Sequence, residues 1–230
     1  MTITYHRDLI QGDTPWLEAR RGLLTASEMK LIITPTLKMA SNDKERSHLF
    51  ELLSQRITGF VEPHYVGDDM LRGMEDEIEG RRVYAERFAP VEEVGFITND
   101  KWGFTIGYSP DALVGDDGLI ECKSRRGKYQ IETILENVAA DTVPVDYVLQ
   151  VQTGLLVSER SWLDFVSYSG GLPMCVIRAY PDPVIQDAII AASTAFEARL
   201  ADKWARYDDI LTSRARLVPT ERRVELEMII

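Results

Sequence analysis

The stretch that decides the fold is GYSPDALVGDDGLIECK, residues 107–123. It carries short apolar runs on either side of a turn-forming Gly-Asp-Asp-Gly segment (115–118). Apolar runs separated by such a turn predict a β-hairpin with a buried face. The hairpin nevertheless begins at Asp111 and ends at Glu121 and Lys123, and charged groups in a buried hairpin need partners or a function.

The register of this hairpin decides which side chains meet. Side chains alternate across a strand, so Glu121 and Lys123 share one face and Cys122 takes the other. A three-residue loop at 116–118, with its glycine in the left-handed conformation, would place Asp111 opposite Lys123 and diagonal to Glu121. A two-residue turn would reverse the parity and separate the two acids. We therefore expect the longer loop, with both carboxylates on one face.

Two carboxylates on one face favour a bound cation between them. An oxygen-rich site suits Mg²⁺ or Mn²⁺ rather than Zn²⁺, and such an ion activates water and holds a phosphate oxygen. Lys123 can orient that water or offset charge in the transition state. This chemistry is metal-assisted hydrolysis of a phosphodiester. The spacing D-x9-E-x-K alone is weak, because an ordinary hairpin with surface acids also fits it; the apolar residues between the acids favour the catalytic interpretation.

The composition is that of an ordinary globular protein. The chain has 230 residues, 45% hydrophobic and 27% charged, which favours one large domain, so we expect residues 1–230 to form a single domain. No apolar run approaches the roughly 20 residues needed to cross a bilayer, so we expect no membrane association. The first residues lack the layout of a signal peptide. Cys122 and Cys175, the two cysteines, offer no disulfide framework, which predicts a reducing cytoplasm.

The net charge of −11 bears on the class of partner. A protein that binds nucleic acid only through phosphate contacts is usually basic, so the charge argues against a plain nucleic-acid coat protein. A nuclease remains compatible with it, because bound divalent cations supply local positive charge. Basic residues can also gather on one face, with Arg20-Arg21, Arg81-Arg82 and the stretch 123–128 as candidates.

Local patterns predict helices, then strands, then helix and strands again. This order describes an α/β sandwich around a mixed sheet. In the helix after Asp68, we expect Met70, Met74, Ile78 and Tyr84 to point inward. Thr25 to Glu28 resemble a helix N-cap. The expected helices are 13–33 (two, with a turn at Gly22), 41–58, 68–88, 128–138, 143–157 and 182–211, and the expected strands are 91–98, 102–108, 111–114, 118–124, 161–169 and 174–180.

Residues 107–123 resemble the nuclease motif of the lambda-phage exonuclease family, the YqaJ-like viral recombinases of the PD-(D/E)xK superfamily. Three further blocks resemble the family in the same order: WLEARRGLLTASE (16–28), RGMEDEIEGRRVYAE (72–86) and YVLQVQTGLLV (147–157). The resemblance implies a restriction-endonuclease-like core, with a central mixed β-sheet flanked by helices. It extends from Trp16 to about residue 180.

The resemblance also assigns roles in the active site. It implies that Asp111 and Glu121 are metal ligands, with the Cys122 backbone carbonyl as a third, and that Lys123 is the catalytic lysine. Glu77 would be a further acid near the metal ions, although exposed acids crowd it in the sequence. Gln150 would be the active-site glutamine, with Gln152 further from the chemistry. The implied cofactor is Mg²⁺, with Mn²⁺ as a substitute and two ions per site.

Arg20 and Ser27 match positions that hold the 5′-phosphate of the DNA end in the family. A guanidinium forms paired bonds with phosphate oxygens, and Arg21 is the competing candidate. Ser109 is expected either to touch this phosphate or only to start the Ser-Pro turn. Within 125–146 the resemblance places no DNA-binding residue, which leaves Arg125, Arg126 and Lys128 unassigned.

The implied function is a metal-dependent 5′-to-3′ exonuclease that digests one strand of linear double-stranded DNA. It would release 5′-mononucleotides and leave a 3′ single-stranded overhang for recombination. The family also implies a ring-shaped homotrimer, a single-strand-annealing protein as partner, and a phage or prophage origin in a bacterial host cytoplasm. Two alternatives remain: an end-independent endonuclease of the same superfamily, and a non-catalytic module that binds DNA ends.

Overall fold

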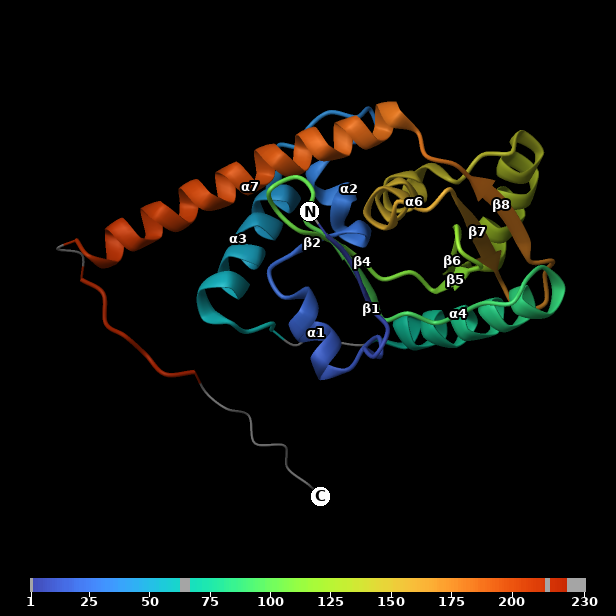
Figure 1. Ribbon diagram of the computed structural model, residues 1–230, viewed down its shortest axis with the longest axis horizontal. Coiled ribbons are helices and arrows are strands. Elements are labelled where there is room, and N and C mark those ends of the chain that lie inside the picture. The colour runs from blue at the N-terminus through green and yellow to red at the C-terminus, as the bar shows by residue number, and fades with distance from the viewer. Residues whose placement is uncertain (1, 63–66, 214–215, 223–230) are drawn as a thin grey trace, which may run out of the picture.

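The computed structural model describes residues 2–62, 67–213 and 216–222. Within these residues the strands form two four-stranded sheets with helices packed around them (Figure 1). The expected α/β class is therefore confirmed, with its strands divided between two sheets. No helix of the described part of the chain is long and apolar enough to span a membrane.

The first sheet has the strand order β1-β3-β4-β2. Strands β1 and β3 run antiparallel, as do β3 and β4, whereas β2 pairs in parallel with β4. The sequence patterns did not predict β1, an edge strand of four residues that is only partly buried. The bounds of these strands are β1 Ile3–His6, β2 Leu24–Thr25, β3 Phe96–Asn99 and β4 Ile106–Tyr108.

The second sheet has the order β5-β6-β7-β8 and carries the hairpin of residues 107–123. Strand β6 pairs antiparallel with β5 and in parallel with β7 along its whole length. A strand with neighbours on both sides suits a run as apolar as Gly118–Ile120. The bounds are β5 Ala112–Val114, β6 Gly118–Ser124, β7 Trp162–Tyr168 and β8 Cys175–Ala179.

The chain passes from one sheet to the other between Tyr108 and Ala112. Pro110 lies in this connection, and proline has no N–H group to donate to a ladder. The expected strands at 102–108 and 111–114 therefore belong to different sheets. Ser109 and Asp111 flank this proline, so both lie where the two sheets meet.

Helices surround the sheets. Helix α6 packs against β3 and β4 on one side and against β7 and α7 on the other, while α4 covers β6 and β7. The expected segment 128–138 is an α-helical turn, α5, that continues as a π-helix, η2. The bounds are α1 Thr14–Arg20, η1 Ala26–Glu28, α2 Met29–Ile32, α3 Asp43–Thr58, α4 Asp68–Arg87, α5 Gly127–Glu132, η2 Thr133–Val138, α6 Val145–Ser158 and α7 Pro183–Leu211.

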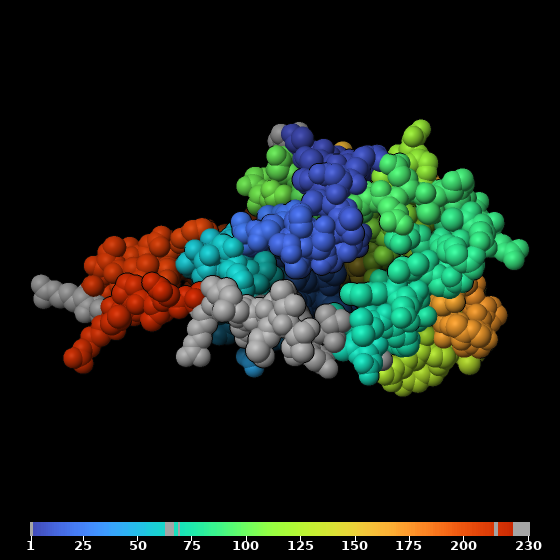
Figure 2. All heavy atoms as spheres, turned by 90° about the horizontal axis from the view of Figure 1, so that it is seen from below, coloured from blue at the N-terminus to red at the C-terminus, as the bar shows by residue number. Residues whose placement is uncertain are grey.

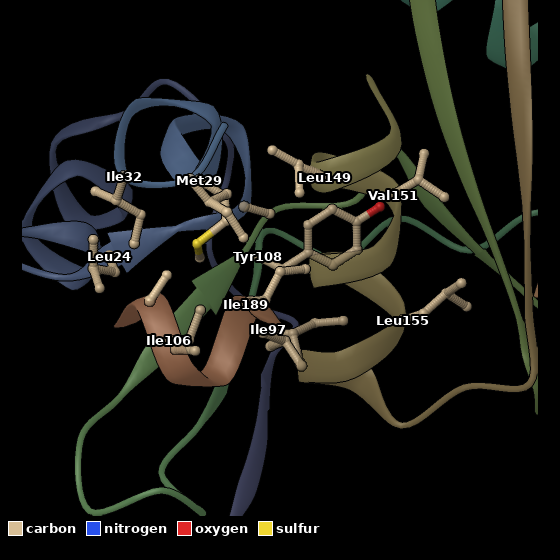
Figure 3. Packing of buried hydrophobic residues seen from close by; sticks show 14 of the residues in the cluster. Leu24, Met29, Ile32, Ile97, Ile106, Tyr108, Leu149, Val151, Leu155 and Ile189 are labelled. Carbon is tan, nitrogen blue, oxygen red and sulfur yellow. The ribbon is translucent and has the colours of Figure 1, made fainter. Parts of the chain in front are cut away.

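Two apolar clusters hold these elements together. The larger one joins α6 and α7 to the first sheet, and Figure 3 shows Tyr108 in it, beside Leu149 and Val151 of α6. The smaller one lies between α4 and the second sheet and is built around Tyr84 and Cys122. The burial of each side chain removes apolar surface from water, which is the main stabilising term of the fold.

The prediction for the inward face of α4 was wrong at three of four positions. Met70, Met74 and Ile78 are 48%, 48% and 60% exposed, and of the four only Tyr84 is buried. The face that meets the second sheet instead includes Gly80, where a Cβ atom would lie 3.4 Å from Tyr168. A glycine lets the helix approach the sheet closely, so apolar periodicity alone pointed to the opposite side.

The N-cap expected near Thr25 is also absent in the predicted form. Thr25 precedes η1 in an extended conformation, but its side chain caps no backbone N–H group. Its hydroxyl group donates to Glu28 Oε2 at 2.6 Å instead. The residue is therefore available for the polar cluster described below.

Candidate active site

The β5–β6 hairpin has a three-residue loop, as predicted, but at a different place. Val114 pairs with Gly118, so the loop is 115–117 and the left-handed residue is Gly115 (φ 53°). Gly118 stays in the strand, where a Cβ atom would lie 2.1 Å from the Trp162 ring. This register places Asp111 opposite Glu121 rather than opposite Lys123. The parity survives the two-residue shift, and the two acids share a face.

Glu121 is the most buried member of this group, with 2% of its surface exposed. Three donors from different elements hold its carboxylate. The Tyr108 hydroxyl donates to Oε2 at 2.8 Å, Lys123 Nζ lies 2.6 Å from Oε1, and Gln150 Nε2 donates to Oε1. Buried charges are stable when they are paired and hydrogen-bonded in this way.

Asp111 is held by the strand beside it. The backbone N–H of Cys122 donates to Asp111 Oδ2 at 2.5 Å, and Arg81 of α4 donates to the Asp111 carbonyl oxygen at 3.1 Å. Burial, and then repulsion by Glu121, raises the pKa of Asp111 to about 8. Two carboxyl groups this close resist simultaneous ionisation unless a cation lies beside them.

Glu77 and Lys123 belong to the same electrostatic group. Burial raises the pKa of Glu77; Lys123 opposes the increase and Glu121 adds to it. Burial by itself would lower the pKa of Lys123, but the carboxylates of Glu121, Asp111 and Glu77 outweigh it, so that pKa lies above its usual value. The amine is therefore a cation at physiological pH. α4 brings Glu77 close enough to the hairpin for its charge to interact with Lys123 and Glu121.

Cys122 has its thiol on the opposite face from the acids. The side chain is fully buried in the smaller apolar cluster, beside Tyr84 and Val166. Burial raises the pKa of this thiol well above its usual value. The thiol is thus a packing group, and a metal ion could use only the backbone of this residue.

The donor set fits a hard divalent cation. Asp111 and Glu121 present carboxylate oxygens on one face, and such ligands suit Mg²⁺ or Mn²⁺. Burial, and then the charge of Glu121, raises the pKa of Asp111, and a cation beside the two acids would favour their ionised forms. Among the described residues, no three His, Cys, Asp or Glu side chains form a ready-made metal cluster. The site therefore offers two side-chain ligands, with remaining positions for backbone, water or substrate oxygens.

A second polar cluster lies next to the first and is centred on Ser109. The Ser109 Oγ atom accepts from Trp16 Nε1 at 3.0 Å and from Arg20 Nη1 at 3.2 Å. The Arg20 guanidinium also stacks on the Trp16 ring, 4.3 Å from its centre. Arg21 points elsewhere: it contacts Glu18 and the Gly59 carbonyl oxygen. The structure thus places Arg20, not Arg21, beside the hairpin.

Thr25 and Glu28 join this cluster, although the sequence predicted only a helix N-cap for them. Arg20 Nη2 donates to Thr25 Oγ1 at 3.3 Å, and the Ser27 hydroxyl lies 3.4 Å from the same oxygen. Burial lowers the pKa of Arg20, and the neighbouring Glu28 opposes this. Ser27 is exposed, whereas Thr25 is buried and its hydroxyl group already donates to Glu28. Arg20, Ser27 and Ser109 thus present one cation and two hydroxyl groups. This is a suitable set for a phosphate monoester.

Tyr108 is the clearest residue that sequence reasoning missed. Its ring packs against α6 (Figure 3). A Cβ atom on Gly154 of this helix would lie 2.7 Å from the ring. Burial, and then the charge of Glu121, raises the pKa of Tyr108 well above its usual value, so the hydroxyl remains a donor. The available signal was its position just before Ser109-Pro110-Asp111.

The two glutamines of α6 face different partners. Gln150 meets Glu121, whereas Gln152 is 6% exposed and bonds the backbone of Tyr180 and Asp182. The expectation that Gln152 lies further from the chemistry matches this placement. On the surface, the molecule is hollowed between α1 and α4 (Figure 2), the helices that carry Arg20 and Glu77.

Comparison with known proteins shows which family and which solved structures this chain resembles. Residues 15–161 match the model of the YqaJ-like viral recombinase domain. No curated protein sequence matches the chain. The match includes the hairpin, both polar clusters and all of the α6 residues discussed above.

Solved structures extend the likeness to most of the chain. An alkaline exonuclease from Laribacter hongkongensis is 31% identical with a TM-score of 0.74, and the alignment covers 86% of this chain and 98% of that one. The same enzyme in complex with dAMP is 32% identical with a TM-score of 0.75, at the same coverage. A phage-related exonuclease from Haemophilus somnus is 14% identical with a TM-score of 0.50, covering 79% of this chain and 96% of that one, a likeness of fold alone.

Proposed function

Because the chain belongs to the family of YqaJ-like viral recombinase domains, we propose that it is a metal-dependent exonuclease that digests one strand of linear double-stranded DNA in the 5′-to-3′ direction. The products are 5′-mononucleotides and a 3′ single-stranded overhang suited to recombination by strand annealing. The dAMP bound by the Laribacter enzyme is itself a mononucleotide, which supports this product class. The whole chain, 1–230, acts as one nuclease domain in this proposal.

The observation that carries the proposal is the convergence on Glu121. Asp111 lies directly before the neighbouring strand, β5, and Lys123 and Gln150 both contact the Glu121 carboxylate. A protein that only binds DNA has no need for two acids and a lysine at one buried point. Phosphodiester hydrolysis needs all three, since it must activate water and stabilise charge on the phosphate.

Asp111, Glu121 and the Cys122 carbonyl would hold the metal, as two Mg²⁺ ions per site or Mn²⁺ in their place. When bound, a divalent ion activates water and offsets negative charge on the phosphate. Lys123 orients the attacking water and stabilises charge in the transition state. Gln150 fixes the position of Glu121 and can donate to a phosphate oxygen. Glu77 is the additional acid, reaching the site from α4.

The cluster around Arg20 would bind the 5′-phosphate of the DNA end. Arg20 supplies the charge, Ser27 and Ser109 supply hydroxyl groups, and the buried Thr25 hydroxyl holds the Arg20 guanidinium in place. Ser109 is two residues from Asp111 in the chain, so a bound end would lie close to the carboxylates. This proximity supports removal of nucleotides one at a time from a phosphorylated end.

We also propose an oligomeric state, a protein partner and a cellular location for the enzyme. The enzyme works as a homotrimeric ring around DNA, together with a single-strand-annealing protein, in the cytoplasm of a bacterium that carries the phage or prophage. A ring allows an acidic exterior around a basic channel, which reconciles DNA binding with the net charge of −11.

The decisive experiment compares linear duplex DNA, labelled at a 5′-phosphate, with covalently closed circles. We expect labelled mononucleotides from the linear DNA in Mg²⁺, none in EDTA, and intact circles under both conditions. Lys123→Ala should bind the linear DNA and release nothing. Nicked circles would favour an endonuclease of the same superfamily, and end binding without release by the wild-type protein would favour a non-catalytic module.

A further inference from the structure

Arg125 lies just past the end of β6 and close to the catalytic lysine. Its guanidinium carbon is 5.4 Å from the centre of the Tyr147 ring, and Lys123 Nζ is 5.9 Å from the same centre. Both cations therefore meet one aromatic ring. Tyr147 is on α6, one turn before Gln150, so Arg125 belongs to the same side of the second sheet as the carboxylates.

The guanidinium of Arg125 is positioned by neutral groups. Nη1 donates to the Tyr147 hydroxyl at 3.0 Å, and Nη2 donates to Thr133 Oγ1 at 3.3 Å. The Nε–H group is buried and has no hydrogen-bond partner in the described structure. Since a guanidinium has five N–H donors, much of its hydrogen-bonding capacity is unused.

The positive charge of Arg125 also has no counter-ion. No acidic side chain of the described residues forms an ion pair with it, whereas Arg56, Arg178 and Arg199 each pair with one. An acidic protein offers many carboxylates, so this absence near the active site indicates an anion supplied from outside.

Aromatic rings contact the Arg125 side chain and fix its position. Tyr147 packs on Phe165, with ring centres 5.2 Å apart, and Tyr129 lies 5.3 Å from the Arg125 guanidinium. Lys128 also contacts the Tyr129 ring, with its Nζ atom 4.5 Å from the ring centre. Stacked arginine with unused donors is a common way to bind phosphate in nucleic-acid interfaces.

We propose that Arg125 binds a backbone phosphate of the degraded strand, next to the phosphate that is cleaved. This inference rests on the proposed nuclease function and adds a contact along the DNA path. Two residues along a strand advance by roughly 6.6 Å, so Arg125 and Lys123 are suitably spaced for neighbouring phosphates. Arg125 is thus a binding residue that sets strand position, and it does not touch the reacting atoms.

The test measures DNA binding as a function of salt, in an Asp111→Asn background so that no substrate is consumed. Arg125→Ala should weaken binding of a 5′-phosphorylated duplex about tenfold. The slope of log Kd against log salt should become shallower by about 0.9, the value for one lost phosphate contact. Arg125→Lys keeps the charge, so the slope should return while the affinity recovers only in part.

Arg82→Ala is the matched control, because Arg82 is exposed and already paired with Glu79 and Glu86. Its slope and Kd should equal those of the parent. An unchanged slope in Arg125→Ala, in a protein with a normal thermal unfolding curve, would overturn the inference. If Arg125→Ala changed the oligomeric state but left the slope unchanged, Arg125 would be assigned to a contact with an acidic group of a second copy of the chain. That result would also refute the DNA contact.

The two proposals fail separately. If the wild-type protein releases nucleotides and Arg125→Ala keeps the parental slope, only this inference is wrong. If the wild-type protein binds DNA but releases nothing in Mg²⁺, the proposed function fails, and the slope still reports whether Arg125 meets a phosphate.

Discussion

Glu121 is a buried acid whose two oxygen atoms are both engaged, by Tyr108 on one side and by Lys123 and Gln150 on the other. Such a carboxylate cannot rotate without breaking several bonds, so its direction is fixed before any substrate arrives. Preorganised polar groups of this kind need no rearrangement during the reaction. At the scale of single residues, the site is thus a rigid acid beside a second acid, Asp111, whose pKa is raised by burial and by Glu121.

Tyr108→Phe tests whether the hydroxyl positions Glu121. We expect a fall in kcat of about tenfold with unchanged DNA affinity, because one of three donors to the catalytic acid is lost. Tyr84→Phe is the matched control: its hydroxyl donates to another buried acid, Asp164, at 2.6 Å. Both variants should lose about 1 kcal/mol of unfolding free energy. An equal loss of kcat in both would show that the effect is only structural.

Asp111→Asn tests the repulsion between the acids. In EDTA the raised pKa of Asp111, about 8, means that the folded protein holds a proton that the unfolded chain releases near its usual value. Stability therefore falls as the pH rises from about 4 to 8, and the variant should lack this contribution. We expect it to melt a few degrees above wild type at pH 8.5, with a smaller gap at pH 6. A difference in melting temperature between the two proteins that does not depend on pH, measured by calorimetry, would contradict this expectation.

Metal ions should reverse that order. Mn²⁺ should raise the melting temperature of the wild type, because ligand binding to the folded state stabilises it. Asp111→Asn lacks one ligand charge and should show a much smaller increase. An equal increase in both proteins would remove Asp111 from the metal site.

Arg20→Ala tests the 5′-phosphate cluster. The preference for 5′-phosphorylated over 5′-hydroxyl ends should disappear, because Arg20 is the charged member of the cluster around Ser109. Arg21→Ala is the neighbouring control; its side chain contacts Glu18 and Gly59, so the preference should persist. Competition between the two kinds of DNA end in one reaction measures the ratio directly.

At the scale of elements, helix α6 connects the hydrophobic core with the candidate active site. Tyr147, Gln150 and Gly154 are spaced three and four residues apart and lie on one face of the helix. Along this face the helix touches Arg125, Glu121 and Tyr108 in turn. A shift of α6 would therefore disturb Glu121 and its neighbours together.

Gly154→Ala tests this coupling. The added Cβ atom would lie 2.7 Å from Tyr108 Cζ, so ring or helix must move, and we expect a loss of about 1–3 kcal/mol in stability together with reduced kcat. Gly73→Ala in α4 is the control, since no atom lies within 4 Å of its Cβ position. It should gain about 0.5–1 kcal/mol. Denaturant unfolding of both variants would refute the idea if Gly154→Ala were also stabilising.

At the scale of the whole molecule, the active residues come from both sheets. Tyr108 ends a strand of the first sheet, and Asp111 precedes a strand of the second. The junction at Pro110 therefore lies between the cluster around Arg20 and the carboxylates. If the first cluster binds a 5′-phosphate as proposed, the DNA end would be directed toward the carboxylates.

Assembly is the prediction that belongs to this scale. If the protein is a ring, sedimentation equilibrium should give three times the 26.1 kDa of one chain. Degradation of long duplexes should then be processive, because a ring cannot fall off sideways. A monomer that remains processive would contradict the ring.

The sequence by itself determined the local features that depend on neighbouring residues. Strand alternation put Glu121 and Lys123 on one face, turn residues marked the hairpin, and the order of helices and strands indicated the α/β class. The resemblance of four blocks identified the family, and the match over 15–161 confirms it. These features can be predicted from sequence because strand and helix periodicities depend on residues that are close together in the chain.

Only the tertiary structure decided which of several equivalent residues meet. It set the hairpin register two residues from the expected one, with Gly118 paired to Val114 in the strand and packed against Trp162. It placed Arg20 rather than Arg21 at Ser109, turned Met70, Met74 and Ile78 of α4 outward, and brought Tyr108 to Glu121. Each of these outcomes depends on contacts between segments far apart in the chain. A local pattern offers the candidates, and packing against distant elements selects among them.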